Sequence, residues 1–534
     1  MYDYIIVGAG SAGCVLASRL SEDPDVEVLV IEAGGPDTLD SIHMPVAFGS
    51  LFKTAVDWDY SSHPEPMCNG RRIFLPRGKV LGGCSSCNAQ IYMRGNRADY
   101  DEWRDLGNPG WGYDDILPFF KRAEDNERGA SEYHGVGGPL GVSDGRSRNV
   151  MMPAFIEAAR QAGLDANDDF NGASQDGVGY YQVTQRGGRR SSTAVAYLHP
   201  AMQRPNVTVE THLQVQRIVF EGRRAAAIVA QRLGETLEFR AEREVILSAG
   251  AYNSPQILML SGVGPAATLQ ALQIPVVEDL PGVGQNLQDH PLCGVVWTTS
   301  EPVSLLTAAT AENLRLYAEE ATGPLTSNIA EAGLFHRTLS GMTAPDVQVH
   351  GAPVMYLDEG LTPPPDHGFT MVVCILKPDS RGSVTLASAD PTAKPVIRHN
   401  YFTAGDDLRS MSDGIRLMME IGGQPGLARF CEKAYQVPDS LSDQDVHAFL
   451  ARCVLTNYHP TSTCRMGSDG GAVVDATLRV HGVEGLRVVD GSIMPSIVRG
   501  NTNAPIIAIA EKAADLIRER TGATALAGAY NEER

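Results

Sequence analysis

The sequence predicts an α/β protein (α+β overall) in which a Rossmann-like domain carries a second domain built on an antiparallel sheet. Three observations lead to this fold. A strand, a glycine turn, a helix and another strand follow one another within the first 34 residues. Short strands mixed with proline-rich turns occupy about residues 293–452. A pattern of strand and helix then returns in the last 75 residues, so the first domain should be assembled from both ends of the chain.

The opening segment has the features of a dinucleotide-binding turn. A strand leads into Gly8-Ala9-Gly10-Ser11-Ala12-Gly13, and the next strand ends at Glu32, 19 residues after the last glycine. Gly8 permits the tight turn, Gly10 lets the backbone approach a pyrophosphate, and Gly13 lets the helix pack closely on the strand. The helix N-terminus offers N–H groups to phosphates, and Glu32 can accept hydrogen bonds from a ribose diol. The pattern therefore predicts a dinucleotide site, and a plain βαβ crossover is the alternative.

Composition narrows the possible partners. The chain has 534 residues, of which 43% are hydrophobic and 20% charged, as is typical of a globular protein with more than one core. The net charge of −20 argues against nucleic acid or an anionic membrane as a partner. No apolar run reaches the roughly 20 residues that span a bilayer, and the early first strand leaves no room for a cleaved signal peptide. Nine cysteines favour a reducing, cytoplasmic setting, with peripheral attachment to the inner membrane left open.

Further strands divide the chain into two domains. Those that belong with the opening motif are Val207–Val209, Val215–Phe220, Glu244–Leu247 and Leu486–Val489. The first domain is therefore assigned to residues 1–160, 190–292 and 453–534, and it ends in a helix from Ala504 to about Arg520. The second domain is assigned to residues 161–189 and 293–452, with strands at Val347–His350, Thr370–Leu376 and Ser383–Leu386.

The expected cofactor is FAD rather than NAD. Passing a hydride from NAD to a flavin would need two nucleotide sites, and only one convincing GxGxxG motif is present. The late strand ending at Val489-Asp490-Gly491 suits the placing of a carboxylate and a turn against the ribityl-pyrophosphate arm of a flavin. The closing helix begins at Asn503-Ala504-Pro505, and its positive end would stabilise the negative charge of a reduced flavin.

Five ordered motifs resemble those of the glucose–methanol–choline (GMC) oxidoreductases. They are Arg77-Gly78-Lys79-Val80-Leu81-Gly82-Gly83-Cys84-Ser85-Ser86-Cys87-Asn88, the segment Gly250–Gly264, the segment Pro281–His290, Tyr458-His459-Pro460 and Thr463–Gly467. They run nearly from one end of the chain to the other, which makes the resemblance far more specific than any single motif. It implies a Rossmann-like FAD-binding domain of GMC type, a separate substrate-binding domain and an FAD-dependent oxidoreductase.

The resemblance also indicates how the flavin is held. Cys87 stands where some choline-oxidising relatives carry a histidine joined covalently to the flavin, so FAD is expected to be bound non-covalently. A thioether from Cys87, or a redox pair with Cys84, is the alternative. The residues expected to contact FAD are Gly8, Gly10, Ser11, Ala12, Gly13, Glu32, Ala33, Arg77, Gly78, Gly82, Gly83, Cys87, Asn88, Val215, Ala249, Gly250, Asp490, Gly491, Asn503 and Pro505. No metal site is expected.

The candidate catalytic residues are His459 and Asn501. An alkoxide releases hydride far more readily than an alcohol, so the reaction needs a base, and histidine has a suitable pKa. By resemblance, His459 is the active-site histidine of the Tyr-His-Pro motif and lies close to flavin N5. Asn501 occupies a position held by asparagine or histidine in relatives, and its amide can donate to the substrate oxygen. The alternative role for Asn501 and Asn503 is capping of the closing helix.

Shorter resemblances bear on the substrate and the electron acceptor. Residues 168–179, 190–194 and 323–331 resemble bacterial members that oxidise sorbose or aliphatic primary alcohols, and choline dehydrogenase-like members are also close in appearance. Asn328, Glu331 and Tyr458 are candidate substrate contacts, although a structural ion pair fits Glu331 equally well. The donor is therefore expected to be a CH–OH group of a primary alcohol, polyol or sugar. A quinone or another non-oxygen acceptor is favoured over oxygen, because the polar Asn457 precedes His459 by two residues.

Two activities of another class occur on the same scaffold. A fatty-acid photodecarboxylase lacks the histidine of the Tyr-His-Pro motif, so His459 counts against that activity. A hydroxynitrile lyase keeps the histidine base but performs no net redox chemistry. Neither enzyme would bleach its flavin with an alcohol in the dark, and a non-enzymatic flavoprotein would be indifferent to the loss of His459. The protein is expected to be a monomer or a homodimer.

Overall fold

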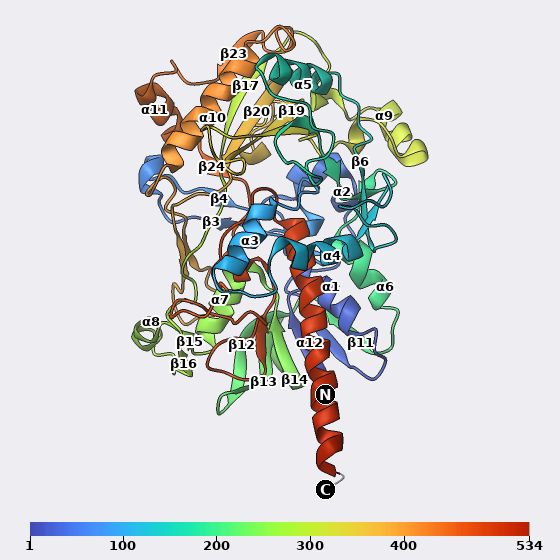
Figure 1. The fold of residues 1–534 in the computed structure, drawn as a ribbon, viewed down its shortest axis with the longest axis vertical. Coiled ribbons are helices and arrows are strands. Elements are labelled where there is room, and N and C mark those ends of the chain that lie inside the picture. Colours follow the sequence, from blue (N-terminus) through green and yellow to red (C-terminus); the bar gives the residue numbers. More distant parts are fainter. Residues whose placement is uncertain (533–534) are drawn as a thin grey trace.

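Two seven-stranded sheets organise the chain, one in the lower half and one in the upper half of Figure 1. The computed structural model describes the backbone of residues 1–532 and the side chains of residues 1–519. Loops and short helices fill the space between the two sheets; the N-terminus lies at the lower sheet, and the last described turns of the closing helix project below that sheet. The mixed α/β architecture with an antiparallel second sheet is as predicted from the sequence.

The first sheet is mainly parallel and has β1 near its centre. Its strands run in the order β11 (Val207–Glu210), β2 (Val28–Ile31), β1 (Tyr2–Val7), β14 (Glu235–Leu247), β13 (Arg224–Arg232) and β12 (Gln214–Glu221). The last part of β14 also pairs in parallel with β25 (Leu486–Val488). Because β1, β2 and β14 run in parallel, the loops after all three strands leave the sheet at one edge. That edge carries the site.

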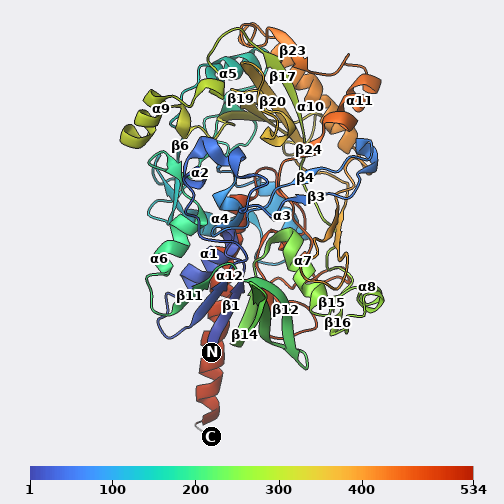
Figure 2. The ribbon, with the colours of Figure 1, turned by 180° about the vertical axis from the view of Figure 1, so that it is seen from behind.

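Helices cover the face of the first sheet that is turned toward the viewer in Figure 1. The helix α12 (Asn503–Glu532) packs against α1 (Ser11–Leu20) and α4 (Tyr113–Ala123). Figure 2 shows the strands from the opposite side. The other helices of this half are α2 (Asp40–His43), α3 (Arg97–Asp105), α6 (His199–Ala201), α7 (Gly250–Leu260) and α8 (Ala266–Ala271). No helix in residues 1–532 is long and apolar enough to cross a membrane.

The second sheet is antiparallel throughout. Its strands run in the order β23 (Lys433–Gln436), β17 (Pro291–Thr298), β20 (Gly368–Ile375), β19 (Val347–Ala352), β18 (Ala332–His336) and β7 (Gly177–Tyr180), and β24 (Leu455–Thr456) also pairs with β17. The helices α5 (Met151–Gln161), α9 (Ala311–Arg315), α10 (Asp407–Gly422) and α11 (Asp443–Cys453) lie in the same half (Figure 1). The strands β17, β19 and β20 are almost wholly buried, which fits the largely apolar sequences of β17 and β20, whereas β19 also buries Gln348 and His350.

Short ribbons lie outside the two large sheets. They are formed by β3 (Tyr60–Ser61) with β4 (Phe74–Leu75), β5 (Glu124–Asn126) with β6 (Leu140–Asp144) and β8 (Gln182–Val183), β9 (Gln185–Arg186) with β10 (Arg189–Arg190), and β15 (Val263–Gly264) with β16 (Glu278–Asp279).

Three elements differ from the sequence expectation. The predicted strand at Ser383–Leu386 forms β21 (Ser383–Thr385), which pairs with β22 (Val396–Arg398) in a separate ribbon. The helix α5 lies in the range assigned to the first domain, but its apolar face packs in the core of the second sheet. The closing helix continues beyond Arg520 to Glu532. The sequence pattern identified the strand at Ser383 and the closing helix by type, but it gave neither the partner of the strand nor the full length of the helix.

Candidate functional site

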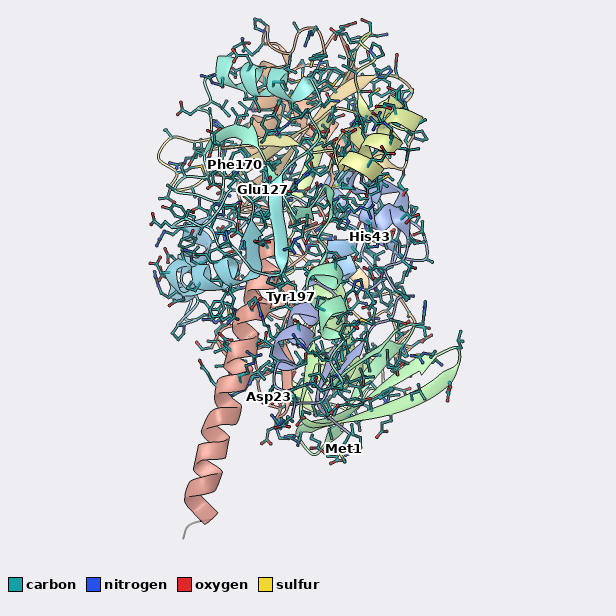
Figure 3. All side chains as sticks on the ribbon, turned by 90° about the vertical axis from the view of Figure 1, so that its right-hand side faces the viewer. Met1, Asp23, His43, Glu127, Phe170 and Tyr197 are labelled. Atoms are coloured by element: carbon teal, nitrogen blue, oxygen red, sulfur yellow. The ribbon has the colours of Figure 1, made fainter. Side chains whose placement is uncertain are left out.

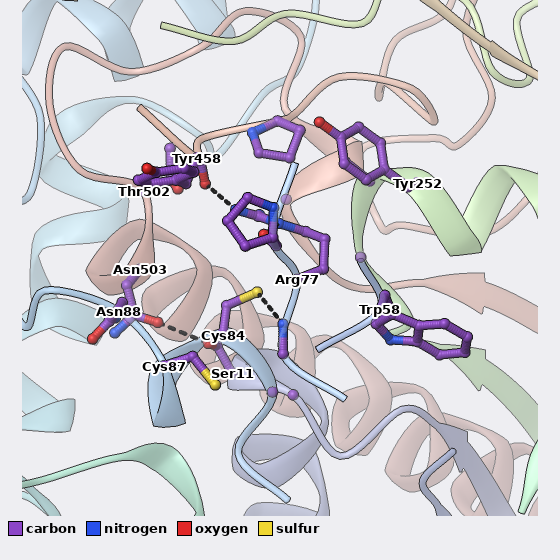
Figure 4. A pocket seen from close by; sticks show the side chains of 18 of the residues that line it. Ser11, Trp58, Arg77, Cys84, Cys87, Asn88, Tyr252, Tyr458, Thr502 and Asn503 are labelled. Carbon is purple, nitrogen blue, oxygen red and sulfur yellow. Dashed lines mark hydrogen bonds between the residues drawn. The ribbon is translucent and has the colours of Figure 1, made fainter. Parts of the chain in front are cut away.

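A deep cavity lies between the two sheets, and segments far apart in the sequence line it (Figure 4). The glycine turn after β1 and the end of β2 form one side. Residues 457–460, 490–491 and 501–503 from the C-terminal part contribute another. His350 and Val372 reach the cavity from β19 and β20 of the second sheet. The chain thus completes one site with residues more than 450 positions apart.

The glycine turn after β1 contains two glycines that the packing of the backbone requires and a third that borders open space. Gly8 has φ +100°, and a Cβ there would lie 2.6 Å from the Ser248 carbonyl oxygen. A Cβ on Gly13 would lie 1.9 Å from the carbonyl oxygen of Gly8, so α1 can pack this closely only on a glycine. A Cβ on Gly10 would meet no atom nearer than 3.9 Å. Gly10 therefore leaves open space at the N-terminus of α1, which suits a pyrophosphate.

A second glycine loop packs directly on the first. A Cβ on Gly83 would lie 2.7 Å from the Gly10 Cα, and one on Gly78 would lie 2.3 Å from the Gly83 oxygen. Gly82, with φ +85°, donates its N–H to the Ala9 oxygen at 2.7 Å. Gly78 and Gly83 line the cavity whereas Gly82 does not. The glycines of this loop consequently hold the first turn in shape as well as bordering the cavity.

Glu32 lies at the end of β2 with its carboxylate at the cavity wall. One oxygen accepts the Ala9 N–H at 3.0 Å and the other accepts the Gly34 N–H at 2.8 Å. Burial raises the pKa of Glu32 to about 7. The carboxylate is thereby fixed beside the glycine turn, as a ribose-binding acid would need to be.

Two helix N-termini meet at the cavity. Ser11, in the first turn of α1, donates its hydroxyl to the Asn503 side-chain oxygen at 2.7 Å. Asn503 begins α12, and its side chain therefore joins the two helices rather than capping one of them. The partial positive charges of both helix starts face the same space, which favours an anionic group between them. Pro505 lies one turn into α12 and does not line the cavity.

Asp490 links two segments at the same edge of the first sheet. One carboxylate oxygen accepts the Gly250 N–H at 2.9 Å and the Ser254 hydroxyl at 2.6 Å. The other accepts the Ser492 N–H at 2.8 Å. Asp490 also lines the cavity, together with Gly491, Ala249 and Val215. Its clearest role in the structure is to fix the start of α7 against the turn that follows β25.

Arg77 and Cys87 border the middle of the cavity. The Arg77 guanidinium donates to the Tyr458 carbonyl oxygen at 2.7 Å, as Figure 4 shows. Cys87 is a free thiol, and burial raises its pKa to about 12. Such a thiol stays protonated at neutral pH, which makes it a poor nucleophile. The sulfur of neighbouring Cys84 accepts the Gly78 N–H at 3.4 Å, and Cys84 is also a free thiol.

The imidazole of His459 stands at the second-sheet side of the cavity between two polar partners. Its Nδ1 lies 3.0 Å from Nδ1 of His290, and its Nε2 lies 3.2 Å from the Asn501 side-chain nitrogen. Its backbone N–H donates to Asp289 at 2.8 Å. Burial, and then the neighbouring His290, His350 and Arg77, lower the pKa of His459 well below its usual value. The side chain is therefore a neutral imidazole at physiological pH.

Aliphatic, aromatic and polar side chains share the lining of the cavity. The Tyr356 and Tyr458 hydroxyls are 2.9 Å apart and hydrogen-bonded to each other. The aliphatic lining includes Ile91, Leu292, Ile329, Ala330, Ala352 and Val372, the phenyl rings are Phe48 and Phe52, and the polar lining includes Gln90, Asn328, His350 and Asn457.

Of the candidate substrate residues, Asn328 and Tyr458 line the cavity and Glu331 does not. Ile329 has φ +69°, and the chain turns there so that Glu331 accepts the Ser327 hydroxyl at 2.6 Å. Glu331 is buried away from the cavity, and this burial raises its pKa. These contacts fit a structural role for Glu331, in which its partner is the Ser327 hydroxyl and not the cation of an ion pair.

Most of the predicted cofactor residues come together at the cavity. Those that line it are Gly8, Gly10, Ser11, Ala12, Glu32, Ala33, Arg77, Gly78, Gly83, Cys87, Asn88, Val215, Ala249, Gly250, Asp490, Gly491 and Asn503. Gly13, Gly82 and Pro505 lie behind it. The sequence analysis did not identify Tyr356, Gln348, His290 or His350 as site residues. His290 is the last residue of the Pro281–His290 motif, and this was the one sequence signal for any of the four.

A Rossmann turn whose cavity is closed by an antiparallel second sheet, with a buried neutral histidine inside, defines a nucleotide-dependent redox enzyme. Models of the GMC oxidoreductase family match residues 2–292 and 378–510, so the chain belongs to that family. Its cofactor is FAD, and the open Gly10 turn, the fixed Glu32 carboxylate and the paired helix starts fit the adenosine and pyrophosphate of that cofactor.

Known proteins resemble the chain over nearly its whole length. It is 44% identical to the mitochondrial choline dehydrogenase of Mus musculus, over 97% of this chain and 89% of the relative. It is 42% identical to the alcohol dehydrogenase [acceptor] of Pseudomonas putida, over 97% of this chain and 96% of the relative. A structure concerned with FAD modification in Aspergillus oryzae formate oxidase matches with a TM-score of 0.91 and 28% identity, over 97% and 98% of the two chains.

Proposed function

We propose that the protein oxidises the CH–OH group of an uncharged primary alcohol to the carbonyl, with His459 as the base. The observation that carries this proposal is the pair formed by His459 and Asn501, which both line the cavity. FAD supplies the hydride acceptor, at N5 of its flavin. His459 Nε2 removes the hydroxyl proton, and the Asn501 amide can donate to the same oxygen without titrating.

The aliphatic lining supports an alcohol with an apolar chain. Side chains such as Leu292, Ile329 and Val372 give the cavity apolar surface that such a chain would cover. The carboxylates lining the described part of the cavity are Glu32, Asp57 and Asp490, and each already accepts backbone N–H groups. A quaternary ammonium group would thus gain no free carboxylate among the residues described.

An anaerobic substrate panel tests this function. The FAD-loaded enzyme is mixed with aliphatic primary alcohols, sorbose, glycerol and choline, and flavin bleaching is followed. We expect the aliphatic alcohols to reduce the flavin fastest. Faster reduction by choline or a sugar would overturn the substrate class, and a flavin that stays oxidised with every alcohol in the dark would instead favour a lyase or photodecarboxylase.

For the electron acceptor we propose a quinone or another non-oxygen acceptor. Asn457 lines the cavity, where it donates a hydrogen bond to the Cys374 sulfur at 3.3 Å. This polar side chain supports the proposal, because an apolar residue beside the flavin would favour reaction with oxygen. We expect turnover with a soluble ubiquinone analogue to exceed oxygen uptake under air. Oxygen uptake at the quinone rate would make the protein an alcohol oxidase.

The pH dependence of flavin reduction follows from the lowered pKa of His459. The base acts only when deprotonated, so a lowered pKa keeps it active down to more acidic pH than an ordinary histidine would allow. We expect the anaerobic reduction rate to be flat from neutral to alkaline pH and to fall only below the usual histidine range. A rate that declines already between pH 8 and 7 would contradict this.

The protonated state of Cys87 predicts that FAD is bound without a covalent link. A thioether would require a reactive sulfur, whereas burial raises the pKa of this thiol to about 12. We expect trichloroacetic acid to leave the yellow flavin in the supernatant above a colourless protein pellet. A yellow pellet that becomes colourless in the Cys87→Ser variant would establish the linkage instead.

A further inference from the structure

The tautomer of one buried histidine follows from a backbone carbonyl. His290 has no exposed surface, and its Nε2 lies 3.1 Å from the Leu376 carbonyl oxygen. A carbonyl oxygen can only accept, so Nε2 of His290 carries a proton. Burial lowers the pKa of His290 to about 4, so the ring is neutral and holds a single N–H. Its Nδ1 is consequently an acceptor.

This assignment determines the protons of His459 in turn. Nδ1 of His290 accepts at 3.0 Å from Nδ1 of His459, which must therefore be the N–H of the second ring. Since His459 is also neutral, its Nε2 keeps a free lone pair. The Asn501 side-chain nitrogen, a donor, faces this lone pair at 3.2 Å.

The hydrogen bonds of Asn501 and Gln348 agree with these proton positions. The Asn501 side-chain oxygen accepts from the Gln348 side-chain nitrogen at 3.3 Å. Gln348 is itself fully buried, and the same nitrogen donates to the Tyr181 hydroxyl at 3.1 Å. Four hydrogen bonds in series, from Gln348 to the Leu376 carbonyl, thus all run the same way, and reversing any one would leave a buried group unpaired.

The neighbouring Asp289 holds the backbone while His290 holds the ring. One Asp289 oxygen accepts the His459 backbone N–H at 2.8 Å. The other accepts the hydroxyls of Tyr401 and Thr456, each at 2.5 Å. Two consecutive residues before β17 therefore fix both the position and the rotation of His459.

We propose that His290 is a positioning residue that fixes His459 in the tautomer with Nδ1 protonated and Nε2 free to act as base. The inference rests on the proposed function of His459. An alcohol hydroxyl donates its proton to Nε2, while Nδ1–H stays bonded to His290 throughout. In the opposite tautomer Nε2 would carry hydrogen and could not accept that proton, just as a wrongly protonated histidine disables a catalytic triad.

Two substitutions at His290 separate a proton-positioning role from a structural one. His290→Asn keeps an acceptor near the place of Nδ1, whereas His290→Leu keeps volume but offers no acceptor. We expect the limiting anaerobic rate of flavin reduction to fall on the order of 10- to 100-fold in the leucine variant and by less than about fivefold in the asparagine variant. FAD content and the substrate concentration for half-maximal reduction should change little in both.

The tautomer itself can be observed without any turnover. In the FAD-loaded protein labelled with ¹⁵N-histidine, the signals lost in the His459→Gln variant belong to His459. We expect them to show a protonated Nδ1 and an unprotonated Nε2 in the wild type, and a mixture of tautomers in His290→Leu. A wild-type His459 protonated at Nε2, or equal reduction rates in the leucine and asparagine variants, would overturn the proposal. Because the NMR result does not depend on activity, it stands apart from a failure of the proposed function.

Discussion

Replacing His459 with alanine is expected to slow flavin reduction by an alcohol by about 10²- to 10⁴-fold, the usual contribution of a general base. His290 cannot take over as the base, because both of its ring nitrogens are engaged in hydrogen bonds. The rate is measured by anaerobic stopped-flow bleaching of the flavin at saturating alcohol.

The matched control is His447→Ala on α11, a histidine outside the cavity. We expect it to reduce its flavin at the wild-type rate. His459→Ala should bind FAD normally, since its side chain contacts His290 and Asn501 rather than the glycine turn. If the alanine variant were reduced as fast as the control, His459 would not be the base and the proposed mechanism would fail.

The cofactor side of the site was predictable because its chemistry is local. The positions of Gly8, Gly10 and Gly13 follow from one short turn; a Cβ would clash with the backbone at Gly8 and Gly13, whereas at Gly10 it would enter open space. The position of Glu32 was also predictable, because β2 pairs with β1 in parallel and the end of β2 therefore lies at the same edge of the sheet as the glycine turn. The geometry of a short motif whose residues contact one another can be predicted from its sequence alone.

The surroundings of His459 were harder to predict because they depend on tertiary pairing. Gln348 and His350 lie on β19, whose strand pattern was visible, but only the pairing of the second sheet places Gln348 against Asn501 and His350 at the cavity. Glu331 shows the reverse case. It lies three residues after Asn328, yet the positive φ of Ile329 turns it toward Ser327 and away from the cavity. Backbone turns of this kind leave no clear residue signature at isoleucine.

A buried acid in the closing helix was also missed, because each of its partners is hundreds of residues away. Glu511 on α12 has no exposed side-chain surface and accepts hydrogen bonds from Arg19 on α1, Arg122 on α4 and the Tyr197 hydroxyl. Figure 3 labels Tyr197 beside α12. The single carboxylate thereby joins three elements to the helix whose first turn borders the cofactor cavity.

Replacing Glu511 with glutamine is expected to lower the free energy of unfolding by about 3 kcal/mol, because two arginines lose the carboxylate they share. This is the lower end of the range for breaking a buried ion pair, since Arg19 and Arg122 keep 18% and 34% of their side chains exposed to water. A fall in the thermal midpoint on the order of 5 °C should result, measured by circular dichroism with saturating FAD.

Asp515→Asn is the matched control for Glu511→Gln. Asp515 lies one turn later on α12 and also pairs with Arg122, but 35% of its side chain is exposed. Exposed pairs contribute about 0–1 kcal/mol, so its loss should shift the midpoint by no more than about 1–2 °C. Equal shifts in the two variants would mean that burial of the carboxylate adds nothing. A larger shift for Glu511→Gln, together with weaker FAD binding, would show that the same carboxylate holds the start of α12 against the cofactor cavity.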